Sequence, residues 1–301
     1  MPDQRRGVAY GAGAYLLWGL FPLYWPLLRP ASALEILAHR VVWSLVVVLA
    51  ILAVQRRWSW SRWVVRDTRA LLGLMVAGLF IGLNWWTYIW GVNHGHVVET
   101  SLGYFISPLM SVLLGVLVLH ERLRRGQWVA VGVAIVAVVV LTVGYGRVPW
   151  IALVLAGSFA LYGLLKKTAP VGPVEGLTVE TAALALPALA WLWLLDSRGE
   201  STFTGLGAGH AMLLALGGVV TVVPLLLFGA SAQRIPLSVL GLLQYLGPIL
   251  QFCFGLLVFH EAMPPVRLVG FLLVWSALIL FTAESLRNRR RTQRLTPQPV
   301  A

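Results

Sequence analysis

The chain has 301 residues, of which 59% are hydrophobic and 11% are charged, and its mean hydropathy is +0.83. A soluble surface carries roughly a quarter of charged residues, so this composition excludes a water-soluble enzyme. A transmembrane helix needs about 20 apolar residues, which leaves room for ten crossings and little for a domain outside the membrane. Any function therefore resides within the bilayer.

The net charge of +12 comes from 23 Lys and Arg against 11 Asp and Glu. The basic residues fall in short loops between apolar runs, where they act as topology signals, and this distribution argues against a nucleic-acid partner. Cys253 is the single cysteine, which excludes an intrachain disulfide and a metal site built from thiolates. We expect no cofactor and no metal, and a monomer or weak homo-oligomer in contact with the lipid bilayer.

Ten apolar stretches follow one another along the chain, and each predicts a membrane-spanning helix. The first continues past a basic start without a small-residue cleavage pattern, so it predicts a helix and not a signal peptide. The fold class is therefore an all-α membrane protein. The predicted spans cover residues 7–28, 34–54, 70–92, 97–119, 126–144, 149–166, 176–195, 208–230, 236–259 and 266–283.

The loops between these spans carry a strong charge bias. With the N-terminus in the cytoplasm, eighteen of the 23 Lys and Arg lie inside, four lie outside, and Arg40 lies within a span. This positive-inside pattern predicts that both termini are cytoplasmic. The polar, basic residues 284–301 predict a disordered cytoplasmic tail.

An internal repeat is the most informative feature of the sequence. Residues 102–121 recur as residues 242–261, with seven identities in twenty positions, and the first spans of the two halves match more weakly. We therefore expect two five-helix repeats, residues 1–144 and residues 145–283. Because five is odd, the second repeat is inverted relative to the first. Inverted repeats are typical of secondary transporters, which hold their substrate near the midplane between the halves.

Three segments resemble a known family: AYLLWGLFPLYW at residues 14–25, ALEILAHR at residues 33–40, and the His-Glu pairs at 120 and 260. They resemble the RarD-type branch of the drug/metabolite transporter superfamily. The resemblance implies a ten-helix EamA-type fold in the bacterial inner membrane. It also implies relatives that export amino acids, such as those of the YddG kind, and others linked to drug sensitivity. No motif specifies a particular solute.

Polar, small and aromatic residues share helical faces in several spans. In the fourth and ninth spans they occupy equivalent positions, which favours a central cavity on the pseudo-twofold axis, although small residues also mark ordinary helix packing. Aromatic residues in the first and third spans would supply flat walls with polar tips, or face lipid or core instead. The candidate substrate-binding residues are Tyr15, Trp18, Asn84, Tyr88, Tyr104, Ser107, Ser111, Tyr162, Gln244 and Gln251.

Pro108 and Pro248 are expected in the middle of the fourth and ninth helices, where each removes a backbone hydrogen bond and would serve as a hinge. Few ionisable groups lie within spans, so we expect a largely uncharged cavity, with a facilitator or a proton site at the rim. Glu35 and Arg40 are expected to bond to neighbouring loops. The pattern of His96 and Glu99 is compatible with a solvated loop or an external gate.

Together these features predict an exporter of small amphipathic metabolites that works by alternating access. Amino acids such as phenylalanine, tryptophan, threonine or methionine come from the resemblance alone. The alternatives are efflux of amphipathic drugs, an intramembrane enzyme that uses Glu180 or His39, and a membrane scaffold without transport. The His-Glu pairs lack the second histidine of a zinc-protease motif, so they are expected to cap helix ends.

Overall fold

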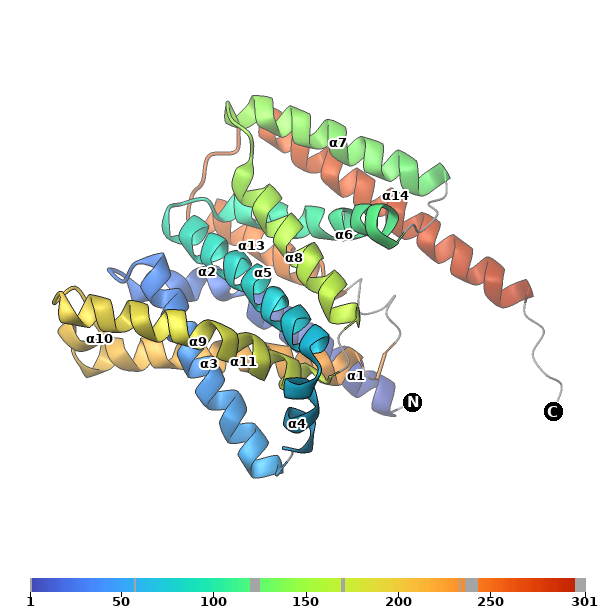
Figure 1. Ribbon diagram of the computed structural model, residues 1–301. Helices are drawn as coiled ribbons and strands as arrows, with labels where there is room; N and C mark the ends of the chain where they lie inside the picture. Colours follow the sequence, from blue (N-terminus) through green and yellow to red (C-terminus); the bar gives the residue numbers. More distant parts are fainter. Residues whose placement is uncertain are drawn as a thin grey trace, which may run out of the picture.

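The computed structural model describes residues 2–56, 58–119, 125–168, 171–232, 234–235 and 243–295, and within them every regular element is a helix (Figure 1). The short helices are α2 (Phe21–Tyr24), η1 (Trp25–Leu28), α4 (Ser59–Arg66) and α10 (Thr202–Gly205). The long helices are α1 (Pro2–Gly19), α3 (Ala33–Gln55), α5 (Thr68–Asn93), α6 (Val97–Leu119), α7 (Arg125–Tyr145), α8 (Trp150–Thr168), α9 (Pro173–Ser197), α11 (Ala208–Ala232), α13 (Leu246–Leu257) and α14 (Pro265–Leu295).

Seven of the described helices are long and apolar enough to cross a membrane: α3, α5, α6, α7, α9, α11 and α14. The apolar parts of α8 and α13 are shorter, at Trp150–Lys166 and Leu246–Leu257. The all-helical membrane class is therefore confirmed. The count of ten crossings, the inverted arrangement of the halves and the cytoplasmic placement of the termini stay predictions.

Local sequence signals explain where several helices begin and break. The Ser32 side chain accepts a hydrogen bond from the Glu35 backbone N–H at the start of α3, and Asp67 caps α5 in the same way, which satisfies N–H groups that lack a partner within the helix. The predicted first span is interrupted after Gly19, because Pro22 and Pro26 lie in the first turns of α2 and η1 and a proline cannot continue the preceding hydrogen-bond ladder.

Two boundaries differ from the predicted ones. The predicted ninth span, 236–259, includes residues 236–242 outside the described part, and α13 covers only Leu246–Leu257. The basic tail was expected from residue 284, whereas α14 stays helical through Leu295 because residues 284–295 contain good helix formers and neither Gly nor Pro. The tail prediction is thus restricted to residues 296–301, which lie outside the described part.

The helix packing is consistent with two equivalent halves. Helix α6 packs against α8, and the equivalent contact is that of α1 with α13. In the same way, the contact of α3 with α11 corresponds to that of α5 with α9, and the contact of α1 with α11 corresponds to that of α5 with α8. Helix α7 also packs along α14, as Figure 1 shows. When α1, α3, α5, α6 and α7 are matched in order with α8, α9, α11, α13 and α14, each of these contacts maps onto its counterpart or onto itself. This pattern indicates two structurally equivalent halves.

Two glycines at the repeat spacing make close backbone contacts between helices. A Cβ atom at Gly78 in α5 would lie 3.0 Å from the carbonyl oxygen of Glu180 in α9, and a Cβ at Gly218 in α11 would lie 2.4 Å from the carbonyl carbon of Trp43 in α3. Small residues let helix backbones approach in this way in membranes. Gly78 and Gly218 therefore permit close helix packing.

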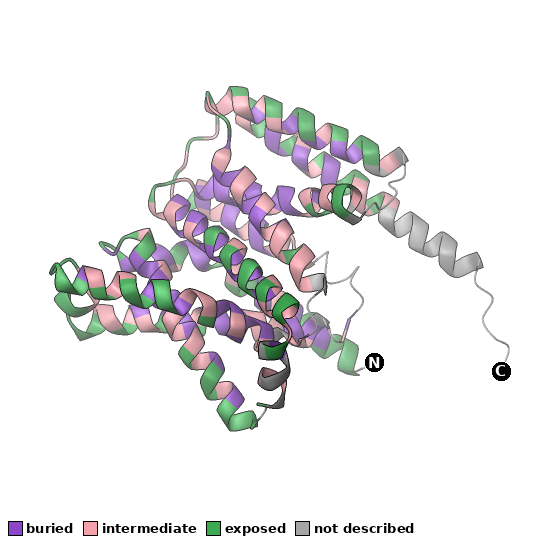
Figure 2. Cartoon of the chain, viewed as in Figure 1, coloured by how far each residue is buried: buried purple, intermediate pink, exposed green. Residues whose placement is uncertain are grey.

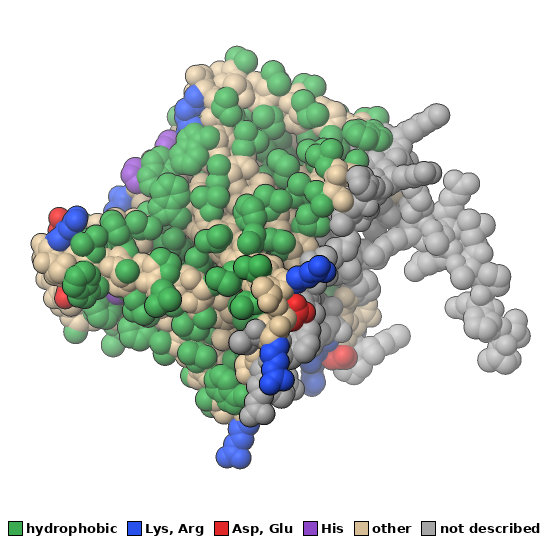
Figure 3. All heavy atoms as spheres, in the orientation of Figure 1, with side chains coloured by type: hydrophobic (Ala, Val, Ile, Leu, Met, Phe, Trp, Pro, Cys, Tyr) green, Lys and Arg blue, Asp and Glu red, His purple; other side chains and the backbone are tan. Residues whose placement is uncertain are grey.

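Apolar side chains cover the outside of the helices. Figure 2 shows exposed residues on the outward faces and buried residues between the helices, and Figure 3 shows hydrophobic side chains over the visible face with Lys and Arg near its edges. Leu79, Val143 and Trp193 are 62%, 72% and 70% exposed. An apolar exterior of this kind fits contact with lipid tails.

We predict that Gly218→Ala destabilises the protein, because the added methyl group meets the rigid Trp43 backbone. Overpacking costs about 1–3 kcal/mol, so the Tm in detergent should fall. The control is Gly132→Ala in α7, where a Cβ meets nothing within 4 Å and the alanine favours the helix. Equal Tm values for the two variants, measured by intrinsic fluorescence, would contradict the packing role of Gly218.

Candidate functional site

A hydrogen-bonded group of side chains lies buried between α5, α6 and α8. The Asn84 Nδ2 group donates to the Leu155 carbonyl and to Ser158 Oγ, both at 3.0 Å, and Asn84 Oδ1 accepts from the Tyr104 hydroxyl at 3.1 Å. The Tyr88 ring stacks edge-on against Tyr104, with the ring centroids 5.6 Å apart. The structure thus brings together three predicted site residues, Asn84, Tyr88 and Tyr104.

Arg40 joins this group, contrary to the sequence prediction that it bonds to a loop. Its side chain is only 3% exposed, and its Nε donates to Thr221 Oγ1 of α11 at 2.7 Å. Its guanidinium lies 4.0 Å from the centre of the Trp85 ring and interacts electrostatically with Tyr88 and Tyr104. A cation therefore belongs to a site that was expected to be largely uncharged. We call Arg40, Asn84, Tyr88 and Tyr104 the tyrosine cluster.

A second group of predicted residues lies between α1 and α13. The Tyr15 and Trp18 rings pack edge-on with centroids 5.3 Å apart, and both contact Phe228 of α11. Gln251 is 3% exposed and donates from Nε2 to the Trp18 carbonyl at 3.1 Å, while its Oε1 has no partner among the described residues. Trp18 also packs against the apolar core around Tyr88, so the two groups adjoin.

The other four predicted residues have different surroundings. Ser107 is buried, and its hydroxyl has no partner among the described residues. Ser111 is exposed and donates to the Ser107 carbonyl of its own helix at 3.0 Å. Tyr162 donates to Glu180 Oε2 at 3.1 Å. Gln244 lies in a turn just before α13, so the structure does not place it on a helical face with Gln251.

The two prolines predicted as hinges are not equivalent. Pro108 lies inside α6, as expected. Pro248 was expected in mid-helix, but it is the third residue of α13, after the N-cap Tyr245. The N–H groups of a first helical turn have no acceptor within the helix, so a proline there costs no hydrogen bond. Pro248 therefore does not interrupt a helix as a mid-helix hinge would.

Buried carboxylates outside the tyrosine cluster have partners. Glu180 is fully buried and accepts from Lys166 Nζ at 2.6 Å. Glu35 accepts from the backbone N–H and the hydroxyl of Thr202 at 2.8 and 3.0 Å, which confirms its expected loop contact. Both carboxylates are therefore held by partners within the fold.

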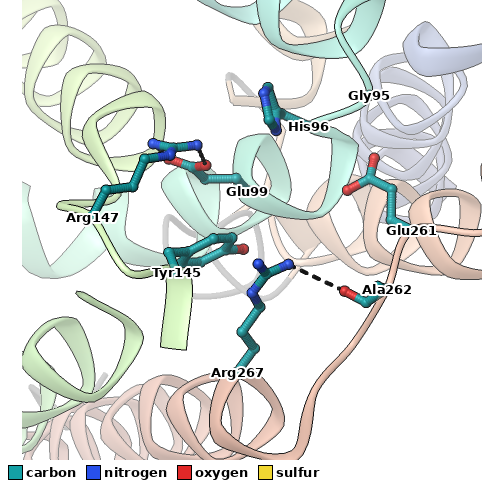
Figure 4. Close-up of a pocket in the computed structure, with 8 residues that line it drawn as sticks. All are labelled: Gly95, His96, Glu99, Tyr145, Arg147, Glu261, Ala262 and Arg267. Atoms are coloured by element: carbon teal, nitrogen blue, oxygen red, sulfur yellow. Dashed lines mark hydrogen bonds and ion pairs between the residues drawn. The ribbon is translucent and has the colours of Figure 1, made fainter. Parts of the chain in front are cut away.

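A charged pocket of about 260 Å³ lies where three helix connections meet (Figure 4). Glu99 forms an ion pair with Arg147 at 2.7 Å, and the Arg267 guanidinium lies 4.2 Å from the centre of the Tyr145 ring. His96 was predicted near Glu99 in a loop or gate; both line the pocket. The lining residues are Gly95, His96, Glu99, Tyr145, Arg147, Glu261, Ala262 and Arg267.

The second His-Glu pair explains how this pocket is held together. The Glu261 carboxylate accepts hydrogen bonds from the backbone N–H groups of Val97 and Val98, so it caps the N-terminus of α6, as expected of a helix-capping residue. His120 and Glu121 of the first pair lie outside the described residues. Glu261 thus connects the α13–α14 loop of the second half to a helix of the first half.

Burial changes the acid–base behaviour of this pocket. Desolvation raises the pKa of the Glu261 carboxyl to about 7, against the opposing effect of the Val98 and Val97 hydrogen bonds and the Arg267 charge. Desolvation also lowers the pKa of His96. A carboxyl group that titrates near neutral pH is therefore built into the contact between the halves.

Comparison with known proteins places the chain in a family. The EamA-like transporter family matches residues 5–143. A protein named RarD from Streptomyces exfoliatus is 59% identical over 97% of this chain and 92% of its own length. The uncharacterized transporter YojE of Bacillus subtilis (strain 168) is 42% identical over 97% of this chain and 98% of its own length. The chain belongs to the RarD-type branch of the EamA-like transporter family.

The fold of this RarD-type transporter also resembles that of a solved protein. A crystal structure matches it with a TM-score of 0.56 at 18% identity, covering 92% of this chain and 97% of that one. The likeness concerns the fold alone. Family and fold together establish a membrane transporter, and they leave the solute open.

Sequence reasoning missed Arg40 as a neighbour of Tyr88 and Tyr104. Its place near the end of a span suggested a loop contact, but two signals pointed inward. No acidic residue stands three or four positions from Arg40, so no partner is available on its own helix. In addition, an ionisable residue inside an apolar run marks a functional position by default.

We predict that protonation of Glu261 stabilises this transporter. The folded carboxyl holds a proton that the unfolded chain, with the ordinary pKa of 4.5, releases. This stabilisation is complete below about pH 4.5 and is lost as the pH rises through about 7. The Tm of the wild type minus that of Glu261→Gln should therefore fall by about 2–4 °C from pH 5 to pH 8.

Thermal unfolding in detergent across this pH range tests the prediction. The variant keeps the other charged and polar residues of the pocket, so the difference in Tm between wild type and variant reports the titration of Glu261. These residues are His96, Glu99, Tyr145, Arg147 and Arg267. The exposed Glu200, replaced by Gln, is the control and should give a difference that does not change with pH. A pH-independent difference for Glu261→Gln as well would rule out the shifted carboxyl.

Proposed function

We propose that this protein exports small amphipathic metabolites, chiefly neutral amino acids, across the bacterial inner membrane. Its two inverted halves, residues 1–144 and residues 145–283, would enclose the solute site and open it to one side at a time. The proposal extends the established assignment, a membrane transporter of the EamA-like family, to a solute class, a direction and a mechanism.

The observation that carries the proposal is that the tyrosine cluster, which belongs to the first half, is hydrogen-bonded to the second half. Asn84 and Tyr104 belong to the first half, and they are held through Ser158 and Leu155 of α8 in the second half. Arg40 of the first half bonds to Thr221 of the second. Substrate sites of inverted-repeat transporters lie at this interface. Aromatic walls with an amide and hydroxyl groups suit a solute with one apolar and one polar end.

Release of phenylalanine from proteoliposomes tests this proposal. Liposomes that contain the wild-type protein and radiolabelled phenylalanine should lose it faster than protein-free liposomes. Tyr104→Ala removes an aromatic wall and the hydrogen bond to Asn84, and it should slow release about tenfold or more, which corresponds to about 1.4 kcal/mol. Tryptophan, threonine and methionine extend the screen, with and without a pH gradient.

Trp193→Ala is the matched control, because Trp193 is also a large aromatic residue but is 70% exposed on the outside of α9. This variant should release phenylalanine at the wild-type rate. Wild-type liposomes that retain every tested amino acid as well as empty ones do would refute the proposed solute class. Appearance of a chemically altered product would instead support an intramembrane enzyme.

A further inference from the structure

Arg40 is a buried positive charge surrounded by aromatic rings. The guanidinium carbon lies 4.0, 5.1 and 5.6 Å from the ring centres of Trp85, Trp25 and Phe21. Such cation–π contacts replace only part of the hydration that a guanidinium loses on burial. A charge at this position is therefore costly to the fold, and a charge retained at such a cost within a membrane protein indicates a functional position.

No carboxylate among the described residues lies within 4.0 Å of Arg40 to neutralise it. The buried acids among the described residues are used elsewhere: Glu35 binds Thr202, Glu99 binds Arg147, and Glu180 binds Lys166. The hydrogen bond given for the guanidinium runs from Nε to the uncharged Thr221 hydroxyl. An arginine side chain offers five N–H donors and no acceptor, so this single acceptor leaves most of the Arg40 donors without a partner among the described residues.

The surroundings of Arg40 add further donors. The Tyr88 hydroxyl is buried and has no hydrogen-bond partner among the described residues, and the same holds for the Trp25 indole Nε1. Tyr104 and Tyr24 already donate their hydroxyl protons, to Asn84 Oδ1 and to the Leu213 carbonyl respectively. What the cluster lacks is an acceptor that carries negative charge. A carboxylate has this chemistry, since it accepts at two oxygens and pairs with a guanidinium in a bidentate geometry.

We propose that Arg40, assisted by the Tyr88 hydroxyl, binds the carboxylate of the transported solute, which makes Arg40 a specificity-determining residue. The aromatic rings around it would receive the apolar part of the same molecule. The transporter then selects solutes that combine a carboxylate with an apolar or aromatic group, and discriminates against their neutral amides. This inference rests on the proposed function in placing the solute at the tyrosine cluster.

A pair of probes that differ only in charge tests the inference by binding. The full-length protein in detergent is titrated with 3-phenylpropionate and with 3-phenylpropionamide, and affinity is read from the rise in Tm. The wild type should bind the carboxylate about tenfold or more tightly than the amide. Phenylalanine compared with 3-phenylpropionate then shows whether the amino group contributes. Equal affinity of the wild type for carboxylate and amide would overturn the inference.

Variants separate carboxylate binding from a structural role. Arg40→Gln should bring the carboxylate-to-amide affinity ratio close to one, Arg40→Lys should retain part of it, and Tyr88→Phe should lower it by a smaller factor. Thr221→Val is the matched control, because it removes the hydrogen bond to Arg40 but leaves the charge, so the ratio should persist. If Arg40→Gln weakens both probes equally and leaves the ratio unchanged, Arg40 is a packing residue and the inference fails.

The two proposals fail in distinguishable ways. Phenylalanine release without a preference for the carboxylate probe refutes the role of Arg40 and leaves the exporter intact. A carboxylate preference without release of any tested amino acid refutes the exporter and leaves the anion site intact. Should Arg40→Gln not fold, the wild-type preference and its reduction in Tyr88→Phe decide the question.

Discussion

The structure depends on one constraint, which is that lipid tails offer no hydrogen bonds to a protein. Backbone groups must therefore pair within helices, and every polar side chain between the helices needs a partner inside the protein. Asn84, Tyr104 and Ser158 meet this requirement by bonding to one another and to backbone carbonyls: Asn84 alone uses two donors and one acceptor. Glu180 meets it by pairing with Lys166. The same constraint makes Arg40 informative, because it is the position where the described partners are too few for the charge.

Much of the fold follows from the sequence, because the signals involved are local. Apolar runs of helical length predict where most helices lie. Ser32 and Asp67 mark helix starts because their side chains accept hydrogen bonds from backbone N–H groups of the first turn. Gly78 and Gly218, which both permit close packing, also lie at the repeat spacing. Boundaries that depend on the three-dimensional context were not predictable. The effect of Pro248 depends on where α13 begins, and the contacts of α13 with α1 and α6 cannot be inferred from the residues around the proline.

The site was predicted in part for the same reason. Asn84, Tyr88 and Tyr104 come together because helical periodicity places each on an inward face, and periodicity can be read from sequence. Gln244 and Ser111 share the polar stripe but lie in a turn and on an exposed face, since a stripe does not reveal where its helix ends or what packs over it. The hydrogen bond from Arg40 to Thr221 joins positions 181 residues apart, and no local pattern encodes such a contact.

Glu261 makes the contact between α6 and the α13–α14 connection dependent on pH. Its carboxyl titrates near neutral pH only while it is shielded from water. Any rearrangement that hydrates this side chain returns its affinity for protons to that of a free glutamate. Between about pH 4.5 and pH 7, separation of the two segments is therefore linked to proton release from Glu261, so acidity on that face of the membrane favours the joined form.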